Sequence, residues 1–133
     1  MATALHAFAM FRTDFPDDAV EENDVVVKTG GENIMEHLRS ALAARRLAPT
    51  PVEPHSFYGW AFEVPVDGVT IWCMIQGVEK WLLITEVRSR LVQRLLGRRP
   101  DEKHEALLRA LAEIMAAPPF REAKWKTRPE YEG

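Results

Sequence analysis

The side chains best suited to chemistry are scattered along this chain and form no known catalytic or metal-binding motif. None of the four histidines (His6, His37, His55 and His104) has another histidine, a cysteine or an acid at the spacing of a zinc site. The motifs Gly-x-Ser-x-Gly and His-Glu-x-x-His do not occur. We therefore predict no catalytic residue, no metal ligand and no cofactor, and we expect His37 and His104 to be surface histidines.

A pair of glycines between a valine run and a predicted helix invites comparison with phosphate-binding loops. The valines occupy residues 25–27, and Gly30 and Gly31 follow them. Helix N-termini bind anions. However, the glycine spacing of dinucleotide-binding loops and the Gly-Lys-Ser/Thr of P-loops are both missing, and Glu32 would stand where a phosphate must lie. We interpret the glycines as a turn before a helix.

Positive charge is concentrated in one segment without an intervening acid, at Arg88, Arg90, Arg94, Arg98 and Arg99. Guanidinium groups suit carboxylates and phosphates. Because the formal net charge is −3, nucleic acid is not the favoured ligand. An acidic protein partner fits this segment, as does the acidic loop at residues 17–24 of the chain itself. A solvated helix face is the simpler alternative.

The length and composition predict one globular domain over residues 1–133, in which residues 1–24 have no clear element and could be loosely ordered. The one cysteine, Cys73, lies in an apolar run, so we expect it to be buried and the protein to be cytoplasmic. No segment approaches the roughly 20 apolar residues of a membrane span.

The helices and strands that we expect along the chain together indicate an α+β fold. We expect an antiparallel three-stranded meander at residues 57–66, 69–76 and 80–87, extended by edge strands near 25–28 and 122–127. We expect helices at 32–46 and 101–117 to pack on this sheet, with a short helix near 89–96.

Helical periodicity predicts which side chains of these helices are buried. The first helix would bury Ile34, Leu38, Ala41 and Leu42, and the last would bury Leu107, Leu108, Leu111, Ile114 and Met115. By the same spacing the short helix would turn Leu91, Val92, Leu95 and Leu96 inward. Asp101 is a candidate N-cap and Gly97 a candidate C-terminal cap.

The Asp67-Gly68 step predicts a two-residue type I′ turn, because both positions of such a turn need a positive φ. This turn sets the register, which places Trp60, Phe62, Val64 and Val66, with Tyr58, on one apolar face. We call it the core face. The opposite, second face carries Glu63 next to Trp72, and Met74 next to Ala61. A solvated face would be more polar than this, so we expect something to cover it.

Three covers of the second face remain open: the N-terminal segment with Phe8, Met10, Phe11 and Phe15, a second copy of the chain, or an external partner or ligand. The predicted site residues for a partner or ligand are Glu63, Trp72, Met74, Arg88, Arg90 and Arg94. A protein partner or self-association, such as a dimer, is favoured over a membrane or nucleic acid.

We therefore predict a small cytosolic binding module without catalysis that captures a protein partner, as an immunity protein or a chaperone does. The predicted order of helix, three-stranded meander and helix is similar to that of secretion chaperones, a similarity of layout that no diagnostic residue carries. The alternative is a small-molecule-binding protein or an enzyme, with a pocket at the second face that uses Glu63 and His55.

Overall fold

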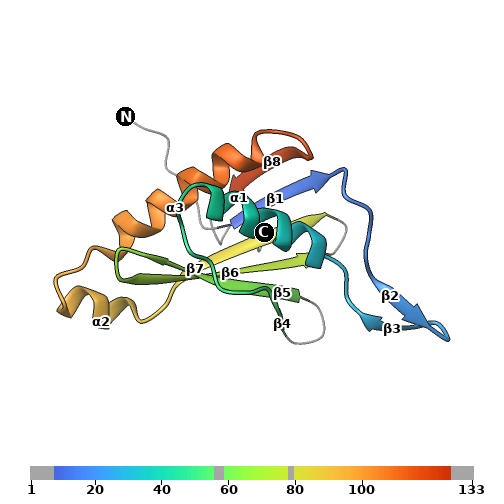
Figure 1. Cartoon of the computed structure of the whole chain (residues 1–133), viewed down its shortest axis with the longest axis horizontal. Coiled ribbons are helices and arrows are strands. Elements are labelled where there is room, and N and C mark those ends of the chain that lie inside the picture. Colours follow the sequence, from blue (N-terminus) through green and yellow to red (C-terminus); the bar gives the residue numbers. More distant parts are fainter. Residues whose placement is uncertain (1–7, 56–58, 78–79, 127–133) are drawn as a thin grey trace.

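The computed structural model describes residues 8–55, 59–77 and 80–126 of the chain (Figure 1). Its strands are β1 (Phe8–Thr13), β2 (Val20–Glu22), β3 (Val25–Lys28), β4 (Glu53–His55), β5 (Gly59–Val66), β6 (Val69–Gly77), β7 (Trp81–Val87) and β8 (Phe120–Lys126). Its helices are α1 (Glu32–Ala44), α2 (Arg90–Leu95) and α3 (Pro100–Met115). The predicted α+β class is confirmed.

Six of the strands form one antiparallel sheet in the order β4-β5-β6-β7-β1-β8. The predicted meander is the centre of this sheet as β5, β6 and β7. Helices α1 and α3 contact each other, and their buried side chains share one cluster with the core face of the sheet. Among the described residues, no helix packs on the second face.

The hairpin of β5 and β6 has the predicted register. Asp67 and Gly68 both have positive φ, at 48° and 86°. Val66 pairs with Val69 and Glu63 pairs with Trp72. The other pairs follow the same register, because each step back along β5 is matched by one step forward along β6. The confirmed register fixes which side chains lie on the core face and which on the second face.

The core consists of the helical stripes and the core face. Ile34, Leu38 and Leu42 of α1 are fully buried, and the predicted stripe of α3 is buried along its length. Cys73 is also fully buried, as predicted, and burial raises the pKa of its thiol strongly. A thiol in this state is a poor nucleophile, so Cys73 acts as a small core side chain.

The N-terminal segment adds a strand that the sequence did not predict. Strand β1 lies between β7 and β8, so it extends the sheet instead of covering its second face. Ala9 and Phe11 point to the core face and are buried, while Phe8 and Met10 lie on the second face. Residues 8–11 are all apolar because both faces of this part of the strand are largely shielded, whereas Arg12 near its end is exposed.

The predicted strand at residues 25–28 exists as β3, but it does not extend the meander. It pairs with β2 in a separate two-stranded ribbon that stands away from the main sheet (Figure 1). The edge-strand prediction at the other end holds, since β8 borders the sheet beside β1.

Helix α2 differs from the prediction in its burial. Leu91, Val92, Leu95 and Leu96 are between 51% and 77% exposed, so the prediction that they point inward is wrong. The reason lies in the opposite side of the helix. Arg90 and Arg94 both form ion pairs with Asp101 of α3, and these pairs turn the apolar side of α2 outward.

Two smaller predictions are also corrected. Helix α3 begins with Pro100 at its first position after Arg99, so Asp101 lies inside the first turn and is not the N-cap. His104 is 9% exposed instead of lying at the surface, and its Nε2 is 2.7 Å from the Thr85 hydroxyl. Gly97 does follow the end of α2 with a φ of 75°, as predicted for a cap.

The element bounds shift slightly from those predicted. Helix α1 ends at Ala44 instead of residue 46, α2 spans residues 90–95 and α3 ends at Met115. The predicted start of the first meander strand, with Tyr58, lies outside the described residues, as do residues 78–79 between the second and third predicted strands. None of the described helices is both long and apolar enough to cross a membrane.

Candidate functional site

The second face of the sheet brings three of the predicted site residues together around Trp72. Glu63 and Glu86 flank Trp72 on the neighbouring strands, because both are its register partners. The guanidinium of Arg88 lies 4.9 Å from the centre of the Trp72 ring. His55 contacts the ring edge-on at 5.1 Å between centroids. We call His55, Glu63, Trp72 and Arg88 the Trp72 surface.

Small residues beneath the Trp72 surface allow its aromatic rings to meet. His55 belongs to β4 and pairs with Gly59, while Trp72 lies one strand further along the sheet. Ala61 lies between them on the second face and offers only a methyl group. The two rings therefore converge above Ala61, on a face where small and large side chains alternate across the strands.

The backbone of Glu63 is fixed by the chain that follows α1. The Thr50 hydroxyl accepts a hydrogen bond from the Glu63 N–H at 2.8 Å, and the Thr50 N–H donates to the Glu63 carbonyl at 2.8 Å. In the described part of the chain, no cation forms an ion pair with the Glu63 carboxylate. The two hydrogen bonds fix the backbone from which the Glu63 side chain projects.

The remaining predicted site residues lie elsewhere. Met74 is 4% exposed, so it supports its neighbours and offers almost no surface. Arg90 and Arg94 belong to α2 and are engaged by Asp101. The structure thus divides the predicted set into the Trp72 surface, which holds Glu63 and Arg88, and a separate group on α2.

The hollow at the Trp72 surface is small, with a volume of about 110 Å³. Its walls include Glu53, His55, Ala61, Glu63 and Trp72. Pockets for small ligands usually enclose about 300–1,000 Å³. This hollow can take one side chain of a partner but not a typical metabolite.

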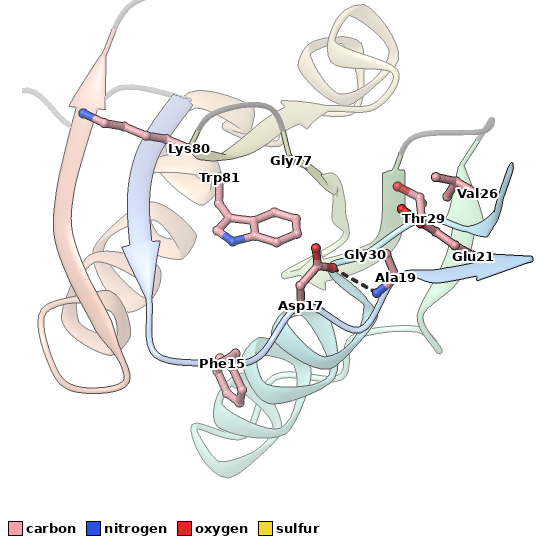
Figure 2. A pocket seen from close by; sticks show the side chains of 10 residues that line it. All are labelled: Phe15, Asp17, Ala19, Glu21, Val26, Thr29, Gly30, Gly77, Lys80 and Trp81. Carbon is pink, nitrogen blue, oxygen red and sulfur yellow. Dashed lines mark hydrogen bonds between the residues drawn. The ribbon is translucent and has the colours of Figure 1, made fainter. Parts of the chain in front are cut away.

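A larger pocket, which the sequence did not reveal, lies between the base of the β2–β3 ribbon and the sheet (Figure 2). Its volume is about 390 Å³. It is lined by Phe15, Asp17, Ala19, Glu21, Val26, Thr29, Gly30, Gly77, Lys80 and Trp81. We call it the Trp81 pocket. In Figure 2 the Asp17 carboxylate lies beside the Trp81 indole and accepts a hydrogen bond from the Ala19 N–H at 2.9 Å, whereas the Lys80 ammonium points away.

The glycines around Trp81 are explained by packing. A Cβ atom on Gly77 would lie 2.6 Å from the Trp81 ring, and one on Gly31 would lie 3.1 Å from it. A Cβ on Gly30 would lie 2.4 Å from an Asp17 carboxylate oxygen. Only glycine allows the indole and this loop to approach so closely. In the sequence, the sign of this close packing is Gly77 shortly before Trp81, together with the Gly30-Gly31 pair.

The N-terminus of α1, beside this pocket, already has an anionic partner. The Asp18 carboxylate accepts hydrogen bonds from the N–H groups of Gly31, at 2.7 Å, and Asn33, at 3.0 Å. Glu32 forms an ion pair with Lys28 at 2.7 Å. Because Asp18 occupies the position that a phosphate would take, this helix end offers no anion site.

The structure shows no constellation typical of a metal centre in its described part. No three side chains among histidine, cysteine, aspartate and glutamate converge there as ligands. The buried pair of His104 and Thr85 is enclosed by the core, and burial, assisted by the charge of Arg90, lowers the pKa of His104. We assign this pair to the core and not to a surface site.

Comparison of the chain with protein-family models, with curated proteins and with solved structures yields no match.

Proposed function

We propose that this protein is a small cytosolic binding module that captures a protein partner through the second face of its sheet. The observation that carries the proposal is the arrangement at Trp72. A half-buried indole lies on a sheet face that no described helix covers, and it is contacted by Arg88 and His55. Tryptophan and arginine are the residue types that most often dominate binding energy at protein interfaces.

The rigidity of the Trp72 surface supports a binding role. Its central side chain comes from a strand in the middle of the sheet, and the backbone of Glu63 is fixed by Thr50. A surface that is already ordered loses less conformational entropy when a partner binds. The carboxylates of Glu63 and Glu86 beside the ring favour a partner that presents donors around an apolar anchor.

The size of the hollow favours a protein over a small ligand. A volume of about 110 Å³ accepts one anchoring side chain. A protein interface spreads over a surface and surrounds a few anchoring side chains with contacts that contribute less binding energy. One buried cysteine and no intrachain disulfide support a reducing compartment.

The experiment is affinity capture from source-cell lysate with the full chain and matched variants. The wild type and Arg99→Glu should retain the same stoichiometric protein, whereas Trp72→Ala and Arg88→Glu should lose it. Arg99 is the control because it is exposed and pairs with Glu102 on another surface. Circular dichroism would verify that each variant is folded. Equal retention by Trp72→Ala would contradict the proposal.

The Trp81 pocket supports a second candidate function, the binding of a small organic cation. The specific observation is an acid, Asp17, whose carboxylate lies beside the Trp81 indole inside a pocket of about 390 Å³. Aromatic faces and carboxylates together attract ammonium and guanidinium groups. Titration with tetramethylammonium should shift Trp81 resonances in the wild type, and Asp17→Asn should weaken this shift. No shift in the wild type would exclude this candidate.

A further inference from the structure

Helix α2 exposes a compact apolar surface at one end of the molecule. Leu91, Val92, Leu95 and Leu96 are 72%, 51%, 77% and 60% exposed. Single exposed apolar residues are ordinary, but four large ones on one short segment mark an interaction surface. We call these four residues the α2 patch. Since α2 is held to α3 by the ion pairs of Asp101, the patch is presented on a fixed support.

The β2–β3 ribbon exposes a second apolar surface at the opposite end of the long axis (Figure 1). Val20, Val25, Val26 and Val27 are between 42% and 60% exposed. An isolated two-stranded ribbon is only marginally stable in water. Such a ribbon, projecting with exposed valines, is best explained by a surface that it packs against. Val25 and Val27 share one face of β3, and we call these two valines the ribbon patch.

The segments that surround the two patches carry opposite charge. Residues 88–99 around the α2 patch contain five arginines and no acid, while residues 17–24 beside the ribbon patch contain five acids and no base. Part of each charge is already engaged, because Asp101 and Glu102 pair with three of the arginines, Arg88 contacts Trp72 and Asp18 caps α1. Arg98 and the acids Glu21, Glu22 and Asp24 form no ion pair within the described residues.

We propose that the ribbon patch of one copy of this chain docks on the α2 patch of another copy. The patches match in apolar character and are complementary in charge, and they lie too far apart along the molecule to meet within one chain (Figure 1). Because the two surfaces differ, the contact is heterologous and leaves a free patch at each end of the pair. Repetition of such a contact gives a ring or a chain of subunits.

This self-association buries neither Trp72 nor Trp81, so it extends beyond the proposed function, although Glu21 and Val26 of the ribbon also line the Trp81 pocket. A copy joined through its two ends keeps its Trp72 surface accessible to a partner. The result would be an array that presents several Trp72 surfaces at once, which raises the avidity for a multivalent partner.

The test is the mass of the full chain in solution, measured by sedimentation velocity and light scattering. The wild type should rise above the 15.2 kDa of one chain as its concentration increases, and salt should reduce the rise because exposed charges are screened. Two double variants each remove one patch: Leu91→Gln with Leu95→Gln, and Val25→Thr with Val27→Thr. Each should lose the association and remain monomeric.

Mixing the two double variants distinguishes a heterologous contact from a symmetric one. Each variant keeps the patch that the other lacks, so an equimolar mixture should form a dimer and nothing larger. Trp72→Ala should associate like the wild type, which separates this proposal from the function of the Trp72 surface. A wild type that stays monomeric, a double variant that still associates or a mixture that forms no dimer would each overturn the proposal. Circular dichroism would show that the variants are folded.

Discussion

The guanidinium of Arg88 stacks on the indole of Trp72, with 4.9 Å between the guanidinium carbon and the ring centre. Arg88 comes just after β7, and its N–H donates to the Thr70 carbonyl at 2.9 Å, so the backbone beneath the pair is fixed. A cation above an indole is stabilised by the ring's electron-rich face. The pair therefore presents an apolar and cationic surface in one orientation before any partner arrives.

Removal of the Arg88 side chain should expose Trp72 to solvent. Arg88→Ala should increase the acrylamide quenching of tryptophan fluorescence, since the guanidinium shields one face of the ring. The expected loss of stability is small, about 0.5–1 kcal/mol, because the pair lies at the surface. Arg99→Ala, whose arginine pairs with Glu102 elsewhere, should leave quenching unchanged. Equal quenching in both variants would show that Arg88 does not shield Trp72.

The turn between β5 and β6 requires glycine at its second position. Gly68 has a φ of 86°, and a Cβ there would also lie 2.7 Å from Nε of Arg98. Gly68→Ala should lower the free energy of unfolding by about 1–2 kcal/mol, the usual cost of a left-handed conformation for a residue with a Cβ. Asp67→Asn keeps a residue that tolerates positive φ but removes the ion pair with Lys103 at 3.0 Å, so it should lower this free energy by only about 0.2–1 kcal/mol. Urea denaturation would measure both values.

The centre of the fold could be predicted from the sequence because neighbouring residues there specify the structure without information from distant parts of the chain. Asp67-Gly68 specifies a two-residue turn, and alternation then assigns every side chain of β5 and β6 to a face. Glu63 and Trp72 could therefore be placed together without coordinates. His55 could not, because it reaches Trp72 from β4, whose pairing depends on the path of the chain after α1.

Other features depend on tertiary context that a periodic pattern does not contain. Periodicity shows that Leu91 and Leu95 share a side of α2, but not whether another element covers that side. The valines of β3 indicate a strand without indicating its sheet. His104 was predictable in principle, because it stands three and seven residues before Leu107 and Leu111 on the buried stripe of α3.

Burial of His104 makes the stability of the fold depend on pH. Burial, together with the charge of Arg90, lowers its pKa below the ordinary 6.5, so the unfolded chain takes up a proton that the folded chain resists. The free energy of unfolding should therefore fall as the pH drops below 6.5, by at most about 1.4 kcal/mol per pH unit. His104→Gln should remove this slope, whereas His37→Gln, which retains His104, should keep it. Urea denaturation at several pH values would test this.

The α2 patch should contribute little to the stability of a single chain. Leu95 is 77% exposed and Leu111 is fully buried. In dilute solution Leu95→Gln should change the free energy of unfolding by less than about 0.5 kcal/mol. Leu111→Ala should lower it by about 2–5 kcal/mol, because it leaves a cavity in the core. Comparable losses in the two variants would mean that α2 is packed within the chain.

The Asp18 carboxylate should stabilise the start of α1. It accepts hydrogen bonds from the N–H groups of Gly31 and Asn33, which have no partner in the preceding turn of a helix. Asp18→Ala should therefore lower the free energy of unfolding by about 0.5–2 kcal/mol. Glu36→Ala, at an exposed position on the same helix, is the matched control and should change it by less than about 0.5 kcal/mol.

The two variants also separate a local cap from a general charge effect, because each removes one negative charge. Asp18→Ala should lower the midpoint of urea denaturation without a change in slope, and added salt should leave most of the loss in place, since hydrogen bonds are screened less than distant charges. If Asp18→Ala and Glu36→Ala lost the same stability, the two hydrogen bonds would contribute nothing measurable.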